Sequence, residues 1–134
     1  MTSTLAQQRS AFALEKIKNL KGDRVSFSKL VPGLPAMILQ NGFGQALSFL
    51  LAKGTDKNGN IDTKDKHIQA FDIMIKWLKE QKIIHETDHT KAITELSNMS
   101  QDKYLHAQEE ALAVLEWVKR YATAGLFKEI KETP

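Results

Sequence analysis

The segment with the clearest potential for chemistry is His85-Glu86-Thr87-Asp88-His89, which matches the metalloprotease pattern H-E-x-x-H. Two histidines four positions apart on a helix face the same way and can share a zinc ion, while the glutamate activates a bound water. Glu109 lies twenty positions after His89, where one branch of these enzymes places a third zinc ligand. A zinc-dependent hydrolase that uses His85, Glu86 and His89 is therefore one hypothesis for this chain.

The surroundings of this pattern favour a different interpretation. Thr87 and Asp88 are polar at positions where the buried helix of a zinc enzyme usually carries apolar residues. The pattern also falls at the junction between two predicted helices, and no strand is predicted that could hold a peptide substrate by its edge. We therefore interpret His85 and His89 as residues of a solvated helix junction, and we expect neither a metal site nor a cofactor.

A second segment, Asp56-Lys57-Asn58-Gly59-Asn60-Ile61-Asp62, resembles the opening of a calcium-binding loop. Side chains with oxygen atoms occupy its first, third and fifth positions. The sixth position, which requires glycine, is Ile61, and the twelfth, which requires glutamate, is His67. We predict a polar turn here. The sequence also has no nucleophile elbow, no phosphate-cradling glycine loop and no cysteine, so we predict that the chain is not an enzyme.

The length and composition indicate the number of domains and the cellular environment. With 134 residues, the chain has the size of one domain, and we expect residues 1–134 to form a single helical domain. The absence of cysteine excludes disulfides and fits a reducing cytoplasm. The N-terminal residues lack the build of a secretory signal, and the apolar stretch 34–52 is interrupted by polar residues. We therefore expect a cytoplasmic location and no membrane partner.

Apolar residues recur at helical spacing, and no stretch alternates as a strand would, so we predict an all-α fold, a compact bundle of about five helices. The first helix should cover residues 4–20. The second should begin at Leu34-Pro35 and end at Gly54, and because it is apolar on nearly all sides, it should be the central helix. Gly42 and Gly44 inside it each cost about 1 kcal/mol relative to alanine, which suggests that another backbone approaches closely.

The remaining helices follow the same reasoning. Asp62 or Thr63 should cap the third helix. A short fourth helix is expected over Lys91–Leu96, and a long C-terminal helix should run from Ser100 to about Lys128. Residues 25–30 are ambiguous. The predicted core stripe of the third helix is Ile68, Phe71, Ile75 and Leu78, and that of the last helix is Tyr104, Ala111, Leu115, Val118, Ala122 and Leu126. The aromatic residues Trp77, Trp117 and Tyr121 are interpreted as packing residues.

Two segments resemble a known family. A leucine-proline pair opens the helix that carries Asn41-Gly42-Phe43-Gly44-Gln45-Ala46 and ends near Lys53, and the last helix has Trp117 just before the basic pair Lys119-Arg120. Both are similar to the small subunit of the Cmr complex, the type III-B CRISPR-Cas effector. The first helix, with Arg9 before Phe12-Ala13-Leu14, fits more loosely. Together these segments cover about half of the chain.

The resemblance implies a function as well as a fold. It implies an all-helical, non-catalytic subunit of a guide-RNA-directed antiviral effector, present in copies that stack along the complex. Such copies would line the channel in which guide RNA pairs with target RNA. The implied partners are the large subunit and the backbone subunits of the Cmr effector, further copies of this chain, and both RNAs. RNA cleavage and cyclic-nucleotide synthesis would belong to the other subunits.

Basic residues are the candidates for contact with the RNA backbone or a partner, since contacts to phosphates give affinity without reading the sequence. Arg9 and Lys16 are seven positions apart and share a helix face. Lysine and arginine exceed aspartate and glutamate by only 19 to 16, so ordinary solvated surfaces remain the alternative. The full set of candidates is Arg9, Lys16, Lys18, Lys21, Lys53, Lys119 and Arg120.

Asn41 and Gln45 form a polar stripe on the helix that carries the family resemblance. They are four positions apart and should project from one side. They either contact a partner or RNA, or they form hydrogen bonds inside the bundle, as buried amides must. We favour the second reading. A helical adaptor that binds only proteins remains a rival for the whole chain, and it would show no salt-sensitive RNA binding.

Overall fold

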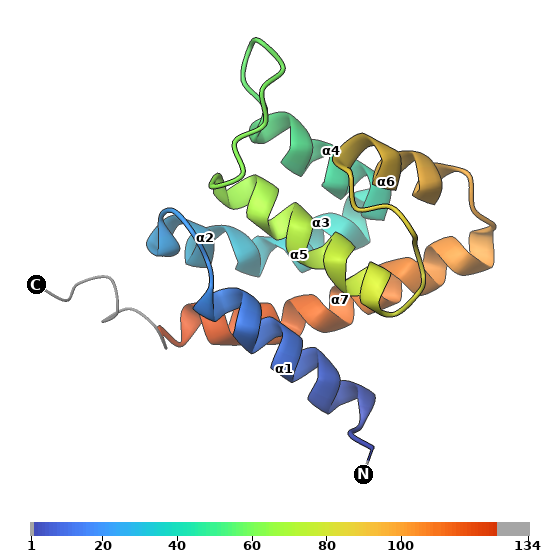
Figure 1. Ribbon diagram of the computed structural model, residues 1–134, viewed down its shortest axis with the longest axis horizontal. Helices are drawn as coiled ribbons and strands as arrows, with labels where there is room; N and C mark the ends of the chain where they lie inside the picture. The colour runs from blue at the N-terminus through green and yellow to red at the C-terminus, as the bar shows by residue number, and fades with distance from the viewer. Residues whose placement is uncertain (1, 126–134) are drawn as a thin grey trace, which may run out of the picture.

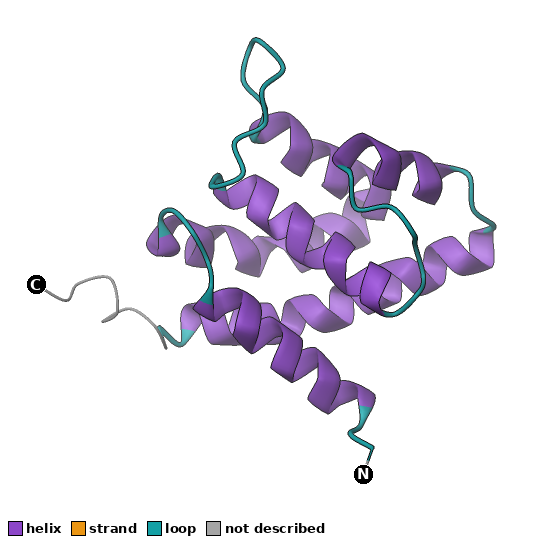
Figure 2. Ribbon diagram, in the orientation of Figure 1, coloured by secondary structure: helices purple, strands orange, loops and turns teal. Residues whose placement is uncertain are grey.

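The computed structural model describes residues 2–125, and every regular element within that range is helical, apart from one isolated bridge between Thr55 and Ile61. Figures 1 and 2 show helices packed around one another, with one loop projecting from the bundle. This confirms the predicted all-α fold. The elements are α1 (Leu5–Lys18), α2 (Arg24–Leu30), η1 (Val31–Gly33), α3 (Leu34–Asn41), α4 (Phe43–Lys53), α5 (Lys66–Glu80), α6 (His89–Ser97) and α7 (Gln101–Thr123).

Side-chain caps set where the helices begin. The Thr4 hydroxyl accepts a hydrogen bond from the Gln7 backbone N–H, and the Gln7 side chain accepts one from the Thr4 N–H, which is a complete capping box for α1. Ser100, predicted as the start of the last helix, is the N-cap of α7, which begins at Gln101. The cap of α5 is Asp65, whereas Asp62 or Thr63 was predicted. The prediction was wrong because Asp62 instead accepts the Lys64 N–H, in a turn that precedes the helix.

The structure also refines the predicted boundaries of three other helices. The ambiguous residues 25–30 belong to α2, which Asp23 caps. The short helix predicted over Lys91–Leu96 is α6 and is slightly longer at both ends. The last helix ends at Thr123, and Gly125 follows with a φ of 69°, a left-handed conformation that commonly terminates helices. The predicted end at Lys128 and the stripe residue Leu126 lie outside the described residues.

The predicted continuous helix over residues 34–54 is wrong, because Gly42 divides it into α3 and α4. Gly42 has a φ of 91° and a ψ of 156°, a conformation that is accessible essentially only to glycine. Its N–H donates to the Ile38 carbonyl over 2.7 Å and closes α3. The chain then changes direction, and α4 starts at Phe43.

Side chains of α7 cap the new helix start. The Gly44 N–H donates to the Tyr104 hydroxyl over 2.7 Å, and the Phe43 N–H donates to Gln108 Oε1 over 3.1 Å. A Cβ atom on Gly44 would lie 3.3 Å from the Tyr104 oxygen. The close approach predicted for this segment therefore comes from a tyrosine side chain and not from another backbone.

The helix that contributes most buried side chains is α5, although residues 34–54 were predicted to be central. The predicted stripe of α5 is fully buried, and Trp77 joins it. By contrast, Leu39 of α3 is 68% exposed, and Phe49 of α4 is exposed as well. The apolar content of residues 34–54 thus exceeds what the bundle buries.

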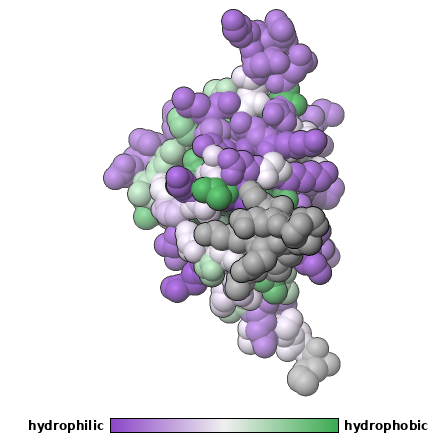
Figure 3. Space-filling view, turned by 90° about the vertical axis from the view of Figure 1, so that its left-hand side faces the viewer, coloured by the Kyte–Doolittle hydropathy of each residue, from purple (hydrophilic) through white to green (hydrophobic). Residues whose placement is uncertain are grey.

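The packing arranges the helices around α5. It contacts α4 on one side and α7 on the other, while α1 packs mainly against α7 (Figure 1). Within residues 2–125, no helix is long and apolar enough to cross a membrane. On the face shown in Figure 3, hydrophobic residues appear in separate places among hydrophilic ones, and the projecting loop is hydrophilic.

Candidate nucleic-acid interface

The two histidines of the H-E-x-x-H pattern bind different carboxylates. His85 lies in the loop before α6, where its Nδ1 is 2.8 Å from Glu95 Oε2, and its side chain is 83% exposed. His89 is the first residue of α6, and its Nε2 lies 2.9 Å from Asp72 Oδ1 on α5. Since the two residues do not share a helix, they do not present their imidazoles to one ion.

This geometry supports the helix-junction interpretation. Glu95 also accepts hydrogen bonds from the backbone N–H groups of His85 and Glu86, so it fastens the loop to α6. Burial raises the pKa of Glu95, but the hydrogen bonds from His85 and Glu86 outweigh it and leave the pKa below its ordinary value. Among the described residues, no three histidine, aspartate or glutamate side chains are grouped so that they could hold a metal ion.

His89 is less solvated than the sequence suggested. Its ring packs against Phe71, with 5.2 Å between the ring centroids. Burial raises the pKa of its partner Asp72, and the opposing charges of His89 and Lys76 only partly offset that effect. The pair therefore joins α6 to α5 at the edge of the core.

The segment that begins at Asp56 is a polar turn, as predicted. Asp56 Oδ1 accepts the backbone N–H groups of Asn58 and Asn60, each over 2.9 Å. The hydrogen bond from Asn60 is the main reason why the pKa of Asp56 lies below its ordinary value. Gly59, with a φ of 82°, completes the turn. The Asp56 carboxylate thus stabilises the turn through hydrogen bonds to the backbone of the same loop.

Arg9, one of the predicted RNA contacts, forms an ion pair inside the protein. Its guanidinium donates from Nε and Nη2 to the two carboxylate oxygens of Glu110, over 3.2 Å and 2.5 Å. The Arg9 side chain is 19% exposed, and Glu110 belongs to the core. Because this carboxylate neutralises its charge, Arg9 does not continue a basic stripe with Lys16.

The other predicted basic residues are accessible but do not form one group. Lys18 and Lys21 are exposed at the end of α1 and in the loop after it, and Lys16 is partly exposed. Lys119 pairs with Glu116 over 3.3 Å, whereas Arg120 is exposed beside it on α7. Lys53 ends α4, next to the projecting loop and away from the end of α7 (Figure 1). Its Nζ lies 5.7 Å from the Phe49 ring centroid.

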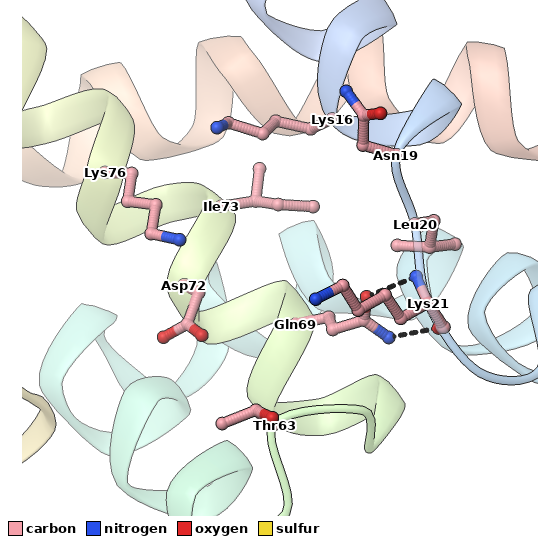
Figure 4. Close-up of a pocket in the computed structure, with 9 residues that line it drawn as sticks. All are labelled: Lys16, Asn19, Leu20, Lys21, Thr63, Gln69, Asp72, Ile73 and Lys76. Carbon is pink, nitrogen blue, oxygen red and sulfur yellow. Dashed lines mark hydrogen bonds between the residues drawn. The ribbon is translucent and has the colours of Figure 1, made fainter.

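The structure brings three lysines together around one depression between α1 and α5, which we name the α1–α5 hollow. It has a volume of about 300 Å³. Figure 4 shows the amine ends of Lys16, Lys21 and Lys76 around Ile73, with the Asp72 carboxylate below the amine of Lys76. The lining residues are Lys16, Asn19, Leu20, Lys21, Thr63, Gln69, Asp72, Ile73 and Lys76.

Lys16 and Lys21 were predicted as contacts with the RNA backbone or a partner, whereas Lys76 and Gln69 were not predicted as site residues. A signal was present, because residues 69, 72, 73 and 76 recur at helical spacing and so share one face of α5. What the sequence could not show is that this face lies opposite the end of α1. That arrangement depends on tertiary packing.

Comparison with protein families decides the identity of the chain. A family model described as CRISPR-associated protein (Cas_Cmr5) matches residues 5–125. The chain belongs to the Cas_Cmr5 family. The resemblance to the small subunit of the type III-B effector is thereby confirmed, and this member of the family is a CRISPR-associated subunit of the Cmr complex.

In this member of the Cas_Cmr5 family, both residues of the polar stripe are exposed. Asn41 is the last residue of α3 and Gln45 lies in the first turn of α4, so Gly42 separates them onto two helices. The preferred reading, hydrogen bonding inside the bundle, is wrong because neither side chain is buried. A contact with a partner or with RNA is the alternative that remains.

The aromatic residues of this family member behave largely as packing residues. Trp77 is buried, and its Nε1 donates to Glu110 over 2.9 Å. Trp117 and Tyr121 are partly buried against the core and lie with their ring centroids 6.0 Å apart. The Tyr121 hydroxyl is hydrogen-bonded to Ser10 of α1, so this tyrosine helps to hold α1 on α7.

Proposed function

We propose that this chain is a non-catalytic small subunit that stacks in copies along the type III-B effector and lines the channel for guide RNA and target RNA. The family match carries the proposal. The protein would act in the cytoplasm as a single helical domain, in contact with the large subunit and the backbone subunits.

The distribution of charge supports contact with RNA through the phosphate backbone. Lys18, Lys53 and Arg120 are exposed, and Lys119 is partly exposed beside Arg120. Lysine and arginine at a surface bind phosphates and release the counterions condensed on the nucleic acid, which gives affinity that does not depend on sequence. This property suits a subunit that must accept any guide.

The geometry of the candidate catalytic pattern supports a non-catalytic role. The imidazoles of His85 and His89 are held by separate carboxylates on different elements. Glu86 is exposed in the loop, and its backbone N–H is bonded to Glu95. An arrangement that activates water needs these groups around a shared point, which the fold does not provide.

The test is RNA binding by the reconstituted effector that contains a charge-neutralised subunit. In the first variant, Lys18, Lys53, Lys119 and Arg120 are all replaced by glutamine. We expect weaker target-RNA binding and a smaller salt dependence, with the slope of log K against log salt reduced by about 0.7 to 0.9 for each lost phosphate contact. A matched variant changes Lys57, Lys79, Lys91 and Lys103, which are all exposed, to glutamine.

The two variants separate the possible outcomes. A loss of affinity confined to the first variant supports the proposal. An equal loss in both variants would show that only the total charge matters, and unchanged binding in both would contradict a role in lining the RNA channel. Equal assembly of both variants into the complex, measured by size-exclusion chromatography, is the control for folding.

A helical adaptor that binds only proteins is the second candidate. Leu39 is 68% exposed, close in the chain to the exposed Asn41, which places an apolar and a polar group on the same accessible segment. Such a combination is typical of protein contacts. Changing Leu39 to aspartate should then reduce assembly of the complex without changing the salt dependence of RNA binding.

A further inference from the structure

The three lysines of the α1–α5 hollow come from elements far apart in sequence and converge on one space. Lys16 and Lys21 lie at the end of α1 and in the loop after it, and Lys76 lies on α5 (Figure 4). We infer that the α1–α5 hollow binds one phosphate group of the RNA backbone between these three ammonium groups. The inference rests on the proposed function, because it names the place where this subunit holds RNA.

The ammonium groups are available to an anion. Lys16 has only a distant carboxylate, Glu15 at 3.9 Å, and its Nζ lies over the Phe12 ring. Within residues 2–125, Lys21 forms no ion pair, and Lys76 forms none at contact distance, although its charge acts on Asp72 of the same helix. The three cations of the hollow therefore have only weak internal partners, which are Glu15 at 3.9 Å from Lys16 and Asp72, which is itself bound to His89.

The carboxylate at the rim is already bound elsewhere. Asp72 Oδ1 lies 2.9 Å from His89 Nε2, so its polar contact is with α6. In Figure 4, Asp72 stands at the opposite rim from Lys16 and Asn19. In the same view, the amine of Lys76 lies between Lys16 and Asp72, so an anion beside Lys16 has a cation between it and the one acidic side chain that lines the hollow.

The loop that carries Lys21 is fixed before any ligand arrives. Gln69 Oε1 accepts the Lys21 N–H over 2.8 Å, and Gln69 Nε2 donates to the Lys21 carbonyl over 2.5 Å. Next to Lys21, Gly22 has a φ of 75°, and a Cβ there would lie 2.6 Å from the Lys64 carbonyl oxygen. A site whose backbone is already ordered loses less conformational entropy on binding.

The end of α1 is also prepared for an anion. The last carbonyl groups of a helix carry partial negative charge and would repel a phosphate. Here, the Arg24 guanidinium donates to the carbonyls of Ile17 and Lys18, over 2.8 Å and 3.0 Å. The positive charge of Arg24 thus offsets the negative end of the helix that forms one wall of the hollow.

The test uses two complementary assays on the full chain and on the assembled effector. In the first, inorganic phosphate is titrated into the isolated chain, and amide shifts are followed by NMR. We expect saturable shifts at Lys21, Gly22 and Gln69 that are absent from a variant with Lys16, Lys21 and Lys76 replaced by glutamine. In the second, RNA affinity is measured for effector assembled with that variant.

The salt dependence distinguishes one phosphate from several. If the three lysines share one phosphate, the triple variant should bind target RNA about tenfold more weakly, and the slope of log K against log salt should fall by only about 0.7 to 0.9. A fall of about 2 or more would overturn the single-phosphate site and show three separate contacts. Lys79→Gln, on the same helix but outside the hollow, is the matched control and should leave both quantities unchanged.

The remaining outcomes separate this inference from the proposed function. If the triple variant binds RNA normally while the variant of Lys18, Lys53, Lys119 and Arg120 does not, the hollow is not an RNA site, although the subunit still lines the channel. If phosphate shifts the amides but RNA affinity is unchanged, the hollow holds a free anion, and the assignment to RNA is wrong. If neither variant alters RNA binding, the proposed function itself fails.

Discussion

Arg9 and Glu110 are 101 positions apart in the chain, yet they form an ion pair in which two guanidinium nitrogens meet two carboxylate oxygens. Trp77 Nε1 donates to the same carboxylate over 2.9 Å. Glu110 is 6% exposed and is the one buried charged residue of the described part of the chain. One side chain on α7 therefore anchors both α1 and α5.

Replacing Arg9 with alanine should lower the free energy of unfolding by about 3 kcal/mol, because it leaves the buried Glu110 carboxylate without its cation. Urea denaturation followed by circular dichroism measures this change. Replacing Lys18, an exposed residue of the same helix, should change the stability by less than about 0.5 kcal/mol. If the Arg9 variant were fully stable but bound RNA weakly, the result would favour the sequence-based prediction of an RNA contact over a structural role for the ion pair with Glu110.

The stability of the protein should fall on acidification partly because of Glu110. Burial raises the pKa of Glu110, but hydrogen bonds from Arg9 and Trp77 outweigh it, so the folded-state pKa lies below the ordinary 4.5. The stabilisation is therefore fully present above pH 4.5 and is lost as the pH falls through the lowered folded-state pKa.

A comparison of the wild type with Glu110→Gln isolates this contribution. The variant should be less stable at neutral pH, and its free energy of unfolding should decline less between about pH 6 and pH 3. The pKa values of Asp56 and Glu95 are also lowered, and their contributions to the free energy of unfolding decline equally in both proteins. The raised pKa of Asp72 changes the free energy of unfolding in the opposite direction, and it does so in both proteins. Parallel pH profiles would contradict the assignment to Glu110.

Gly42→Ala should cost about 2 kcal/mol, because a side chain at a φ of 91° and a ψ of 156° is strained whatever space surrounds it. Gly33→Ala is the control, since its φ is −86° and a Cβ there would meet nothing within 4 Å. That substitution should raise the stability by about 0.5 kcal/mol. Thermal denaturation of the two variants should therefore show shifts of opposite sign, and equal shifts would refute the role of the bend.

Zinc should not bind stoichiometrically at the H-E-x-x-H pattern, because His85 and His89 contact carboxylates on different elements. Isothermal titration of the purified chain with zinc chloride is the measurement. His89→Ala should instead lower the stability by about 1 kcal/mol through loss of the Asp72 contact. Tight binding of one zinc ion that Glu86→Gln or His85→Ala weakens would restore the hydrolase hypothesis.

The helices were predictable from the sequence because their signals are local. Apolar residues at helical spacing predicted α1, α5 and α7, and Ser100 predicted the start of the last helix. The bend at Gly42 was missed because the residues on both sides favour a helix, and only the φ of the glycine and the Tyr104 contact decide otherwise. Glycine inside a helical pattern was the available signal, and it was read as a packing feature.

The candidate site was only partly predictable, for a related reason. Lys16 and Lys21 were recognisable as basic residues near a helix end, but their meeting with Lys76 depends on how α1 lies against α5. Arg9 shows the opposite case, because a cation on a helix face gives no local sign of the buried carboxylate that binds it. Charge is visible in a sequence, whereas the pairing of charges requires the fold.

The packing of α1 against α7 has a consequence for synthesis on the ribosome. At about 5–20 residues per second, α7 follows α1 by several seconds. Helices of fewer than about 12–15 residues are marginal in isolation, and α1 has 14. The nascent α1 is therefore expected to remain only partly helical, with its apolar side chains accessible to chaperones, until the segment that carries Glu110 leaves the exit tunnel.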